Sequence, residues 1–154
     1  MKSFIKLSFC AFLFAFLCAC GFQDGSYSAK AASPDSLGYQ AYLDITVQDG
    51  VITGAEFDAV NSRNIRKSQD TEFAKLMIPA TGISPGEISA HYQQLLLGCK
   101  SYRKVKVDAL CGATVSSHEF ADLWSALETS LKKGQHNQVI LPPRAEYTAK
   151  CIDE

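Results

Sequence analysis

The sequence predicts an α+β fold, a single domain whose mostly antiparallel sheet contains a β-hairpin and is packed by two or three helices. Apolar and polar residues alternate over residues 39–47 and again from residue 51, on either side of an Asp-Gly pair, which is typical of two half-buried strands. Residues 117–133 carry apolar side chains at helical spacing instead. The order of elements (a strand, a hairpin, helices, a strand and a last helix) favours a mostly antiparallel sheet.

The first 19 residues are predicted to be a signal peptide. Lys2 and Lys6 precede an apolar stretch, residues 7–17, that is shorter than the roughly 20 residues a transmembrane helix needs. The sequence LCAC at residues 17–20 resembles the lipobox of bacterial lipoproteins, in which cleavage leaves a lipidated cysteine, here Cys20. An ordinary signal peptide rich in cysteine is the alternative. We expect acyl chains on Cys20 to hold the protein to a membrane of the bacterial cell envelope, inner or outer, on its extracytoplasmic side.

Residues 20–35 are expected to form the lipidated cysteine and a tether, with one short strand around residues 26–30. Loss of Lys2 and Lys6 leaves 13 of the 15 basic residues against 16 acidic ones, a net charge of −3, which argues against nucleic acid as a partner. The histidines and cysteines show no metal-ligand spacing, so no metal site is expected. Three cysteines remain for one disulfide, and the sequence leaves the pair open: Cys99, Cys111 and Cys151.

The register of the hairpin decides which residues its core face carries. A three-residue loop over residues 48–50 pairs Val47 with Val51 and keeps one face apolar. A two-residue turn would set Leu43 beside Glu56 on the core face, because a slip of one residue turns every side chain to the other face. We therefore predict the three-residue loop.

A polar loop over residues 61–70 leads to a short predicted helix. Asp70 or Ser68 is suited to cap this helix, and Pro79 is expected to end it before a turn at Thr81-Gly82. Three apolar side chains of the helix are expected to point inward: Phe73, Leu76 and Met77.

Two longer helices are predicted beyond that turn, separated by a strand over residues 103–107. Pro85 suits the first turn of one helix, which ends near Gly98. The last helix spans residues 117–133, with Ser116 or Ser117 as its N-cap. The chain loses periodicity over residues 135–154, which are expected to form a loosely docked or disordered tail. The inward positions are Ile88, Tyr92, Leu95 and Leu96 in the first of these helices, and Phe120, Leu123, Trp124, Leu127 and Leu131 in the second.

The run DALCGATVSS at residues 108–117 connects the predicted strand to the last helix. Backbone N–H groups point outward at the N-terminus of a helix, where the helix dipole also favours negative charge. A phosphate can bind at such a place. The sequence therefore predicts an anion-binding turn that presents the hydroxyl of Thr114.

Taken with DGSY at 24–27, GY at 38–39, DG at 49–50 and KSQD at 67–70, this run resembles the flavinylation motif of the FMN-binding domain family. The resemblance covers residues 24–134. The family includes the FMN subunits of the sodium-translocating NADH:quinone reductase and of the Rnf complex. Together with the lipobox, the chain is most similar to small lipoproteins called major membrane immunogens.

The resemblance implies that a flavin transferase uses FAD to attach FMN covalently, through its phosphate, to Thr114, with AMP as the leaving group. The protein would then be a membrane-anchored electron carrier rather than an enzyme with its own substrate, and the resemblance leaves its redox partner open. Cys111 stands where the family usually has Ser or Thr, which leaves open whether the transferase accepts it or modifies Thr114 less efficiently. The KSQD segment at 67–70 replaces a Glu-Thr-Pro-Gly type, so flavin contacts are not carried over at that loop. Asp108 is expected to be a recognition residue for the transferase. Further residues are expected at the cofactor: Gly112, Ala113, Ser116, Ser117, Thr81, Gly82 and Tyr42.

Two other functions compete with the carrier. One is a cofactor-free surface lipoprotein with a binding or structural role, in which the motif is a relic. The other is a hydrolytic or acyl-transfer enzyme that uses Ser116 or Ser117. The sequence does not support that enzyme, because it lacks a Gly-x-Ser-x-Gly elbow and a positioned base.

Overall fold

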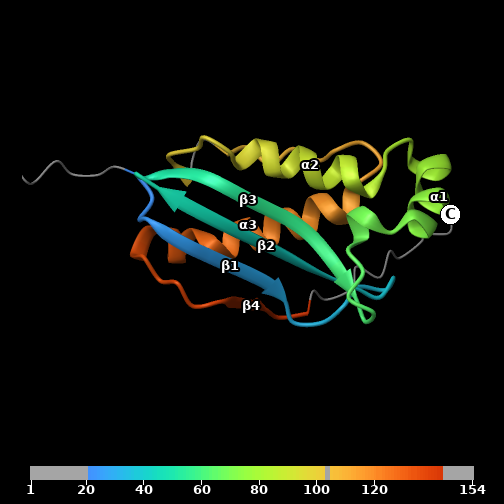
Figure 1. The fold of residues 1–154 in the computed structure, drawn as a ribbon, viewed down its shortest axis with the longest axis horizontal. Coiled ribbons are helices and arrows are strands. Elements are labelled where there is room, and N and C mark those ends of the chain that lie inside the picture. Colours follow the sequence, from blue (N-terminus) through green and yellow to red (C-terminus); the bar gives the residue numbers. More distant parts are fainter. Residues whose placement is uncertain (1–20, 103–104, 144–154) are drawn as a thin grey trace, which may run out of the picture.

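The computed structural model describes residues 21–102 and 105–143 and confirms the α+β class (Figure 1). The predicted signal peptide and Cys20 lie outside these residues. Four strands form one mixed sheet in the order β3-β2-β1-β4, with β1, β2 and β3 antiparallel and β4 parallel to β1. The elements are β1 (Gly25–Ala31), β2 (Tyr39–Gln48), β3 (Val51–Asn61), the 3₁₀ turn η1 (Lys67–Gln69), α1 (Thr71–Thr81), α2 (Pro85–Leu96), α3 (Thr114–Lys133) and β4 (Val139–Leu141).

The core lies between the sheet and two of its helices. Helix α2 packs on β3, and α3 packs on β1 and β2. Every second residue of β2 is buried, and all five predicted inward positions of α3 are buried as well. The ring of Tyr92 on α2 stacks on Phe120 of α3 with centroids 4.3 Å apart, and Phe57 of β3 meets both rings edge-on. These aromatic contacts join three elements at the centre of the fold.

The predicted three-residue hairpin loop is wrong. The turn has two residues, Asp49 and Gly50, with φ of 54° and 71°, as in the left-handed turns that suit tight hairpins. A β-bulge then adds one residue, Thr53, to β3, so that Leu43 faces Phe57. The bulge restores the apolar face that a two-residue turn alone would have lost. A two-residue turn is therefore compatible with one apolar face when a bulge follows it, an arrangement that the prediction left out.

Helix α1 is capped as predicted but does not pack as predicted. The side chain of Asp70 accepts a hydrogen bond from the backbone N–H of Phe73 at 3.0 Å. None of the residues of α1 is buried, and 76% of Leu76 is exposed, so its predicted inward position is wrong. Phe73 and Met77 are half-buried against the edge of the core.

Pro79 does not end α1. The helix continues to Thr81, and Gly82 closes it in the left-handed conformation, with φ of 75° and its N–H bonded to the carbonyl of Ile78. A proline this close to the end of a helix removes only one backbone bond. The left-handed glycine, rather than the proline, therefore sets the end of the helix.

Two predictions about strands were wrong. Residues 105–107 of the predicted strand at 103–107 are irregular, and residues 103–104 lie outside the described part. Strand β4 lies in the segment that was predicted to be a tail, and it pairs with residues Ala29–Ala31 of β1. A strand of three residues is too short to show a period of two along the sequence.

Candidate functional site

The motif turn packs against the end of α1. Gly112 has φ of 79°, and a Cβ atom at this position would lie 2.4 Å from the carbonyl oxygen of Thr81. Only glycine combines this backbone conformation with so close an approach. The structure therefore brings Thr81, one of the expected cofactor residues, directly to the motif.

Helix α3 begins at Thr114, three residues earlier than predicted, so the prediction that Ser116 or Ser117 is its N-cap is wrong. Ala113 occupies the N-cap position, and no side chain in the described part of the chain caps it. The first helical hydrogen bond runs from the N–H of Ser117 to the carbonyl of Ala113, at 2.8 Å. The N–H groups of Thr114, Val115 and Ser116 precede that bond and lie at the positive end of a 20-residue helix.

Ser117 has a structural role. Its side chain is 2% exposed, and its hydroxyl accepts hydrogen bonds from the O–H of Tyr92 at 2.7 Å and the N–H of Leu110 at 3.1 Å. The same hydroxyl donates to the carbonyl of Ala113 at 2.8 Å. These three bonds use the full capacity of a hydroxyl group. Ser117 therefore fixes the turn and does not face a ligand.

Tyr92 belongs to the same arrangement, and sequence reasoning missed its role. The helical spacing placed Tyr92 in the core, where it is fully buried. Its hydroxyl also lies 3.2 Å from the carbonyl oxygen of Asp108, at the start of the motif. One indication of this role was present in the sequence: a tyrosine at a predicted core position carries a hydroxyl that must find a hydrogen-bond partner when it is buried.

The other motif side chains are accessible. Thr114, Cys111 and Asp108 are exposed, and Cys111 forms no disulfide with a cysteine in the described part of the chain. Val115 is 59% exposed, which is unusual for a large apolar side chain next to a packed turn. The hydroxyl of Thr114 is therefore open to an enzyme or a ligand from solvent.

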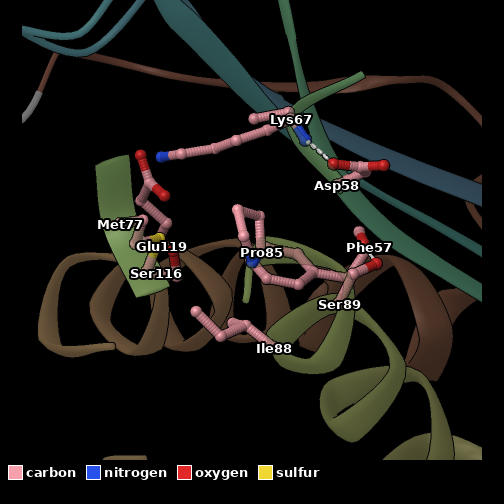
Figure 2. Close-up of a pocket in the computed structure, with 10 residues that line it drawn as sticks. Phe57, Asp58, Lys67, Met77, Pro85, Ile88, Ser89, Ser116 and Glu119 are labelled. Atoms are coloured by element: carbon pink, nitrogen blue, oxygen red, sulfur yellow. Dashed lines mark hydrogen bonds between the residues drawn. The ribbon is translucent and has the colours of Figure 1, made fainter. Parts of the chain in front are cut away.

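Ser116 is half-buried and lines a small cavity between α1, α2, α3 and β3 (Figure 2). The cavity volume is about 20 Å³, which holds about one water molecule and cannot admit a flavin ring. Figure 2 shows the Lys67 side chain directed toward Glu119 across this cavity. The ammonium of Lys67 lies 3.4 Å from the carboxylate of Asp35 and 5.3 Å from the ring centres of Tyr39 and Phe73.

Ser68 and Asp70 of the KSQD segment at 67–70 have structural roles in the fold. The N–H and hydroxyl of Ser68 donate to the carboxylate of Asp58, which ties η1 to β3. The hydroxyl of Tyr39 donates to Asp70 at 2.7 Å, and this bond, with the N–H of Phe73, lowers the pKa of Asp70. Burial, followed by the bond to Asp70, raises the pKa of Tyr39 to about 12.

Tyr42 lies away from the motif. It alternates with the buried residues of β2 and so occupies the sheet face opposite the helices, the face that the sequence assigned to it. Its hydroxyl donates to Glu56 at 2.8 Å, and burial and this bond raise its pKa. The structure does not bring Tyr42 to Thr114.

The described residues contain no group of three side chains placed to hold a metal ion, and no helix among them is both long and apolar enough to cross a membrane. No protein-family model matches the chain. The crystal structure of the CPE2226 protein from Clostridium perfringens has the same fold, with a TM-score of 0.72 and 29% identity over 79% of this chain and 98% of that one.

The "15 kDa lipoprotein" of Treponema pallidum is 30% identical to this chain over 125 residues. The match covers 79% of this chain and 87% of the relative. A relationship to a lipoprotein agrees with a membrane-anchored protein of the cell envelope. The chain belongs to the family of this 15 kDa lipoprotein.

Proposed function

We propose that the protein is a membrane-anchored electron carrier that holds FMN through a phosphoester to Thr114 and is anchored by lipid at Cys20. One observation carries the proposal. Helix α3 is the longest helix of the described chain, and it alone among the three α-helices begins without a side-chain cap. An exposed threonine is the first residue of this open end.

The motif residues fit the phosphate end of the cofactor. A phosphodiester carries one negative charge, which the N–H groups of Thr114, Val115 and Ser116 and the helix dipole stabilise by ~0.3–1 kcal/mol. The close approach of Gly112 to Thr81 leaves no room for a side chain in the turn. The hydroxyl of Ser117 holds the turn from its buried side. These residues orient the attachment point rather than react.

The flavin supplies the redox chemistry, while the protein supplies position and electrostatics. The cavity beside Ser116 is too small for the ring, which favours a ring at the surface, next to Thr81 and Gly82. The exposed side chains of Asp108 and Cys111 are available for recognition by a flavin transferase. A covalent bond suits a carrier outside the cytoplasm, because a lost cofactor could not be replaced there.

The test is to co-express the protein with a flavin transferase and to examine it on a denaturing gel. We expect in-gel flavin fluorescence and an added FMN mass on the peptide that contains Thr114. Thr114→Ala should lose both signals. Thr71→Ala is the matched control, because Thr71 is the exposed first residue of α1, and this variant should keep both. A colourless protein with no added mass would instead favour the cofactor-free surface lipoprotein.

A further inference from the structure

The fold begins immediately after Cys20. A Cβ atom on Gly21 would lie 2.9 Å from the carbonyl oxygen of Gly50, so the backbone of Gly21 packs against the hairpin turn. Phe22 is 6% exposed and meets the ring of Trp124 edge-on, with centroids 6.3 Å apart. A chain spans at most ~3.6 Å per residue, so one residue cannot act as a tether. The tether expected over residues 20–35 is therefore replaced by packed structure from Gly21 onward.

The chain that follows Cys20 enters the domain beside the C-terminal end of α3, whereas Thr114 lies at the N-terminal end of this helix. The N–H of Gln23 bonds to the carbonyl of Leu131, in the last turns of α3. Thr114 is the first of the 20 residues of this helix, which spans about 30 Å at roughly 1.5 Å per residue. Figure 1 shows the start of the described chain beside the C-terminal end of α3, with the N-terminal end of α3 on the opposite side of the molecule.

We propose that the domain stands directly on its membrane with Thr114 at the far end, so that its redox partner is a protein that approaches from the aqueous side. This inference rests on the proposed lipid at Cys20 and the proposed flavin at Thr114. In this upright orientation, a site about 30 Å from the anchored end is out of reach of a quinone that stays within the same bilayer.

The surface around the site fits a protein partner. Val115 is 59% exposed beside Thr114, and α1, whose last residue contacts Gly112, exposes 76% of Leu76 and 45% of Ile78. Exposed apolar side chains mark a contact surface where they form a continuous patch. They could also insert into lipid if the domain lay flat. The position of the anchor favours the protein, and the membrane is the competing outcome of the test.

The orientation is tested without flavin. The lipidated full chain is placed in phosphatidylcholine vesicles that contain a lipid-borne fluorescence quencher. A thiol-reactive fluorophore is attached at Asp49→Cys, in the hairpin turn, or at Val115→Cys. Both variants also carry Cys111→Ser, and the Cys111→Ser protein without an added cysteine measures the label on other cysteines. We expect strong quenching at residue 49 and none above background at residue 115. Equal quenching at both positions would overturn the upright orientation.

The partner class is tested with FMN-loaded protein in the same vesicles. A Gly/Ser linker of about 20 residues, inserted between Cys20 and Gly21, has a root-mean-square span of roughly 25 Å and lets the domain turn over. A long-chain quinol in the bilayer should reduce the flavin of the linker variant more than about tenfold faster than that of the unmodified protein, because the site of the latter is out of reach. A water-soluble reductant should reduce both at the same rate.

The two arms separate the possible failures. Absence of flavin would refute the proposed cofactor while the quenching measurement still reports the orientation. If the quinol reduced the unmodified protein as fast as the linker variant, the aqueous partner would be excluded in favour of a quinone.

Discussion

The N-termini of α1 and α3 are built from similar parts and end differently. Each helix starts with an exposed threonine, Thr71 or Thr114. Asp70 precedes Thr71 and caps α1 by accepting the N–H of Phe73. Ala113 precedes Thr114 and caps nothing. A side chain therefore accepts a hydrogen bond from a backbone N–H in the first turn of the shorter helix, while the first N–H groups of the longer helix have no side-chain cap among the described residues.

Packing explains how α3 tolerates an open end. Helix α3 buries seven of its residues, whereas α1 buries none. A buried large apolar side chain stabilises a fold by roughly 1.5–3 kcal/mol, and a cap contributes about 1 kcal/mol. The contacts of α3 with the sheet outweigh a missing cap, but α1 places only half-buried side chains such as Phe73 and Met77 against the core and depends more on its ends. The difference teaches that a helix secured by its core can leave its N-terminus available for an anion.

The largest expected effect comes from Gly112→Ala, compared with Gly82→Ala. Both glycines are left-handed, with φ of 79° and 75°, but a Cβ meets no atom within 4 Å at Gly82 and lies 2.4 Å from Thr81 at Gly112. Gly82→Ala should cost ~1–2 kcal/mol for the backbone alone. Gly112→Ala should cost roughly 3 kcal/mol or more in urea unfolding and abolish flavin attachment. Equal losses would show that the contact between the motif and α1 is not tight.

A smaller loss is expected for Ser117→Ala, which opens the buried side of the α3 turn. The substitution leaves the N–H of Leu110 without its acceptor and the hydroxyl of Tyr92 with only the longer contact to the carbonyl of Asp108, at a cost of ~1–3 kcal/mol. Flavin loading should fall too, because the turn is no longer fixed. Ser125→Ala is the matched control on an exposed position of the same helix and should change neither unfolding nor loading. Identical behaviour of the two variants would refute the positioning role of Ser117.

The sequence could predict elements and faces because those depend on local periodicity. The buried rows of β2 and α3 and the cap at Asp70 all follow from spacing and residue type within one segment. Thr81 was expected at the cofactor, but its close approach to Gly112 was not predicted. It is a contact between distant segments, which periodicity alone does not report.

The predictions that were wrong concern residues whose environment is set by distant parts of the chain. The apolar side of α1 looks like a core face, but nothing local shows that Leu76 is exposed. Ser117 is a good N-cap residue, yet Tyr92 and Leu110 engage its hydroxyl inside the fold. The register of the hairpin depends on a bulge at Thr53, which tertiary packing rather than turn chemistry selects.

Asp70→Asn tests the α1 side of the comparison through pH. Hydrogen bonds from the hydroxyl of Tyr39 and the N–H of Phe73 lower the pKa of this carboxyl in the folded state. A lowered pKa adds stability above the unfolded value of about 3.9, and this stability is lost as the pH falls through the folded value. Wild type should therefore melt above Asp70→Asn at pH 7, and the difference should vanish in strong acid. Glu72→Gln, in the same turn, serves as the control. A difference between wild type and Asp70→Asn that is independent of pH would contradict this reading.

The smallest effect is expected for Cys111→Ser, which changes the chemistry beside the α3 N-terminus without changing its cap. Residue 111 lies two positions before the N-cap, and its side chain is exposed. A hydroxyl there cannot replace the missing cap, so unfolding should stay within ~0.5 kcal/mol of wild type. Flavin per protein, measured by absorbance after denaturation, should also stay the same, because Thr114 and the N–H groups before the first helical bond are unchanged. A severalfold rise in loading would mean that the transferase reads the side chain at 111. The open end of α3 would then be necessary for attachment but would not by itself set how efficiently attachment occurs.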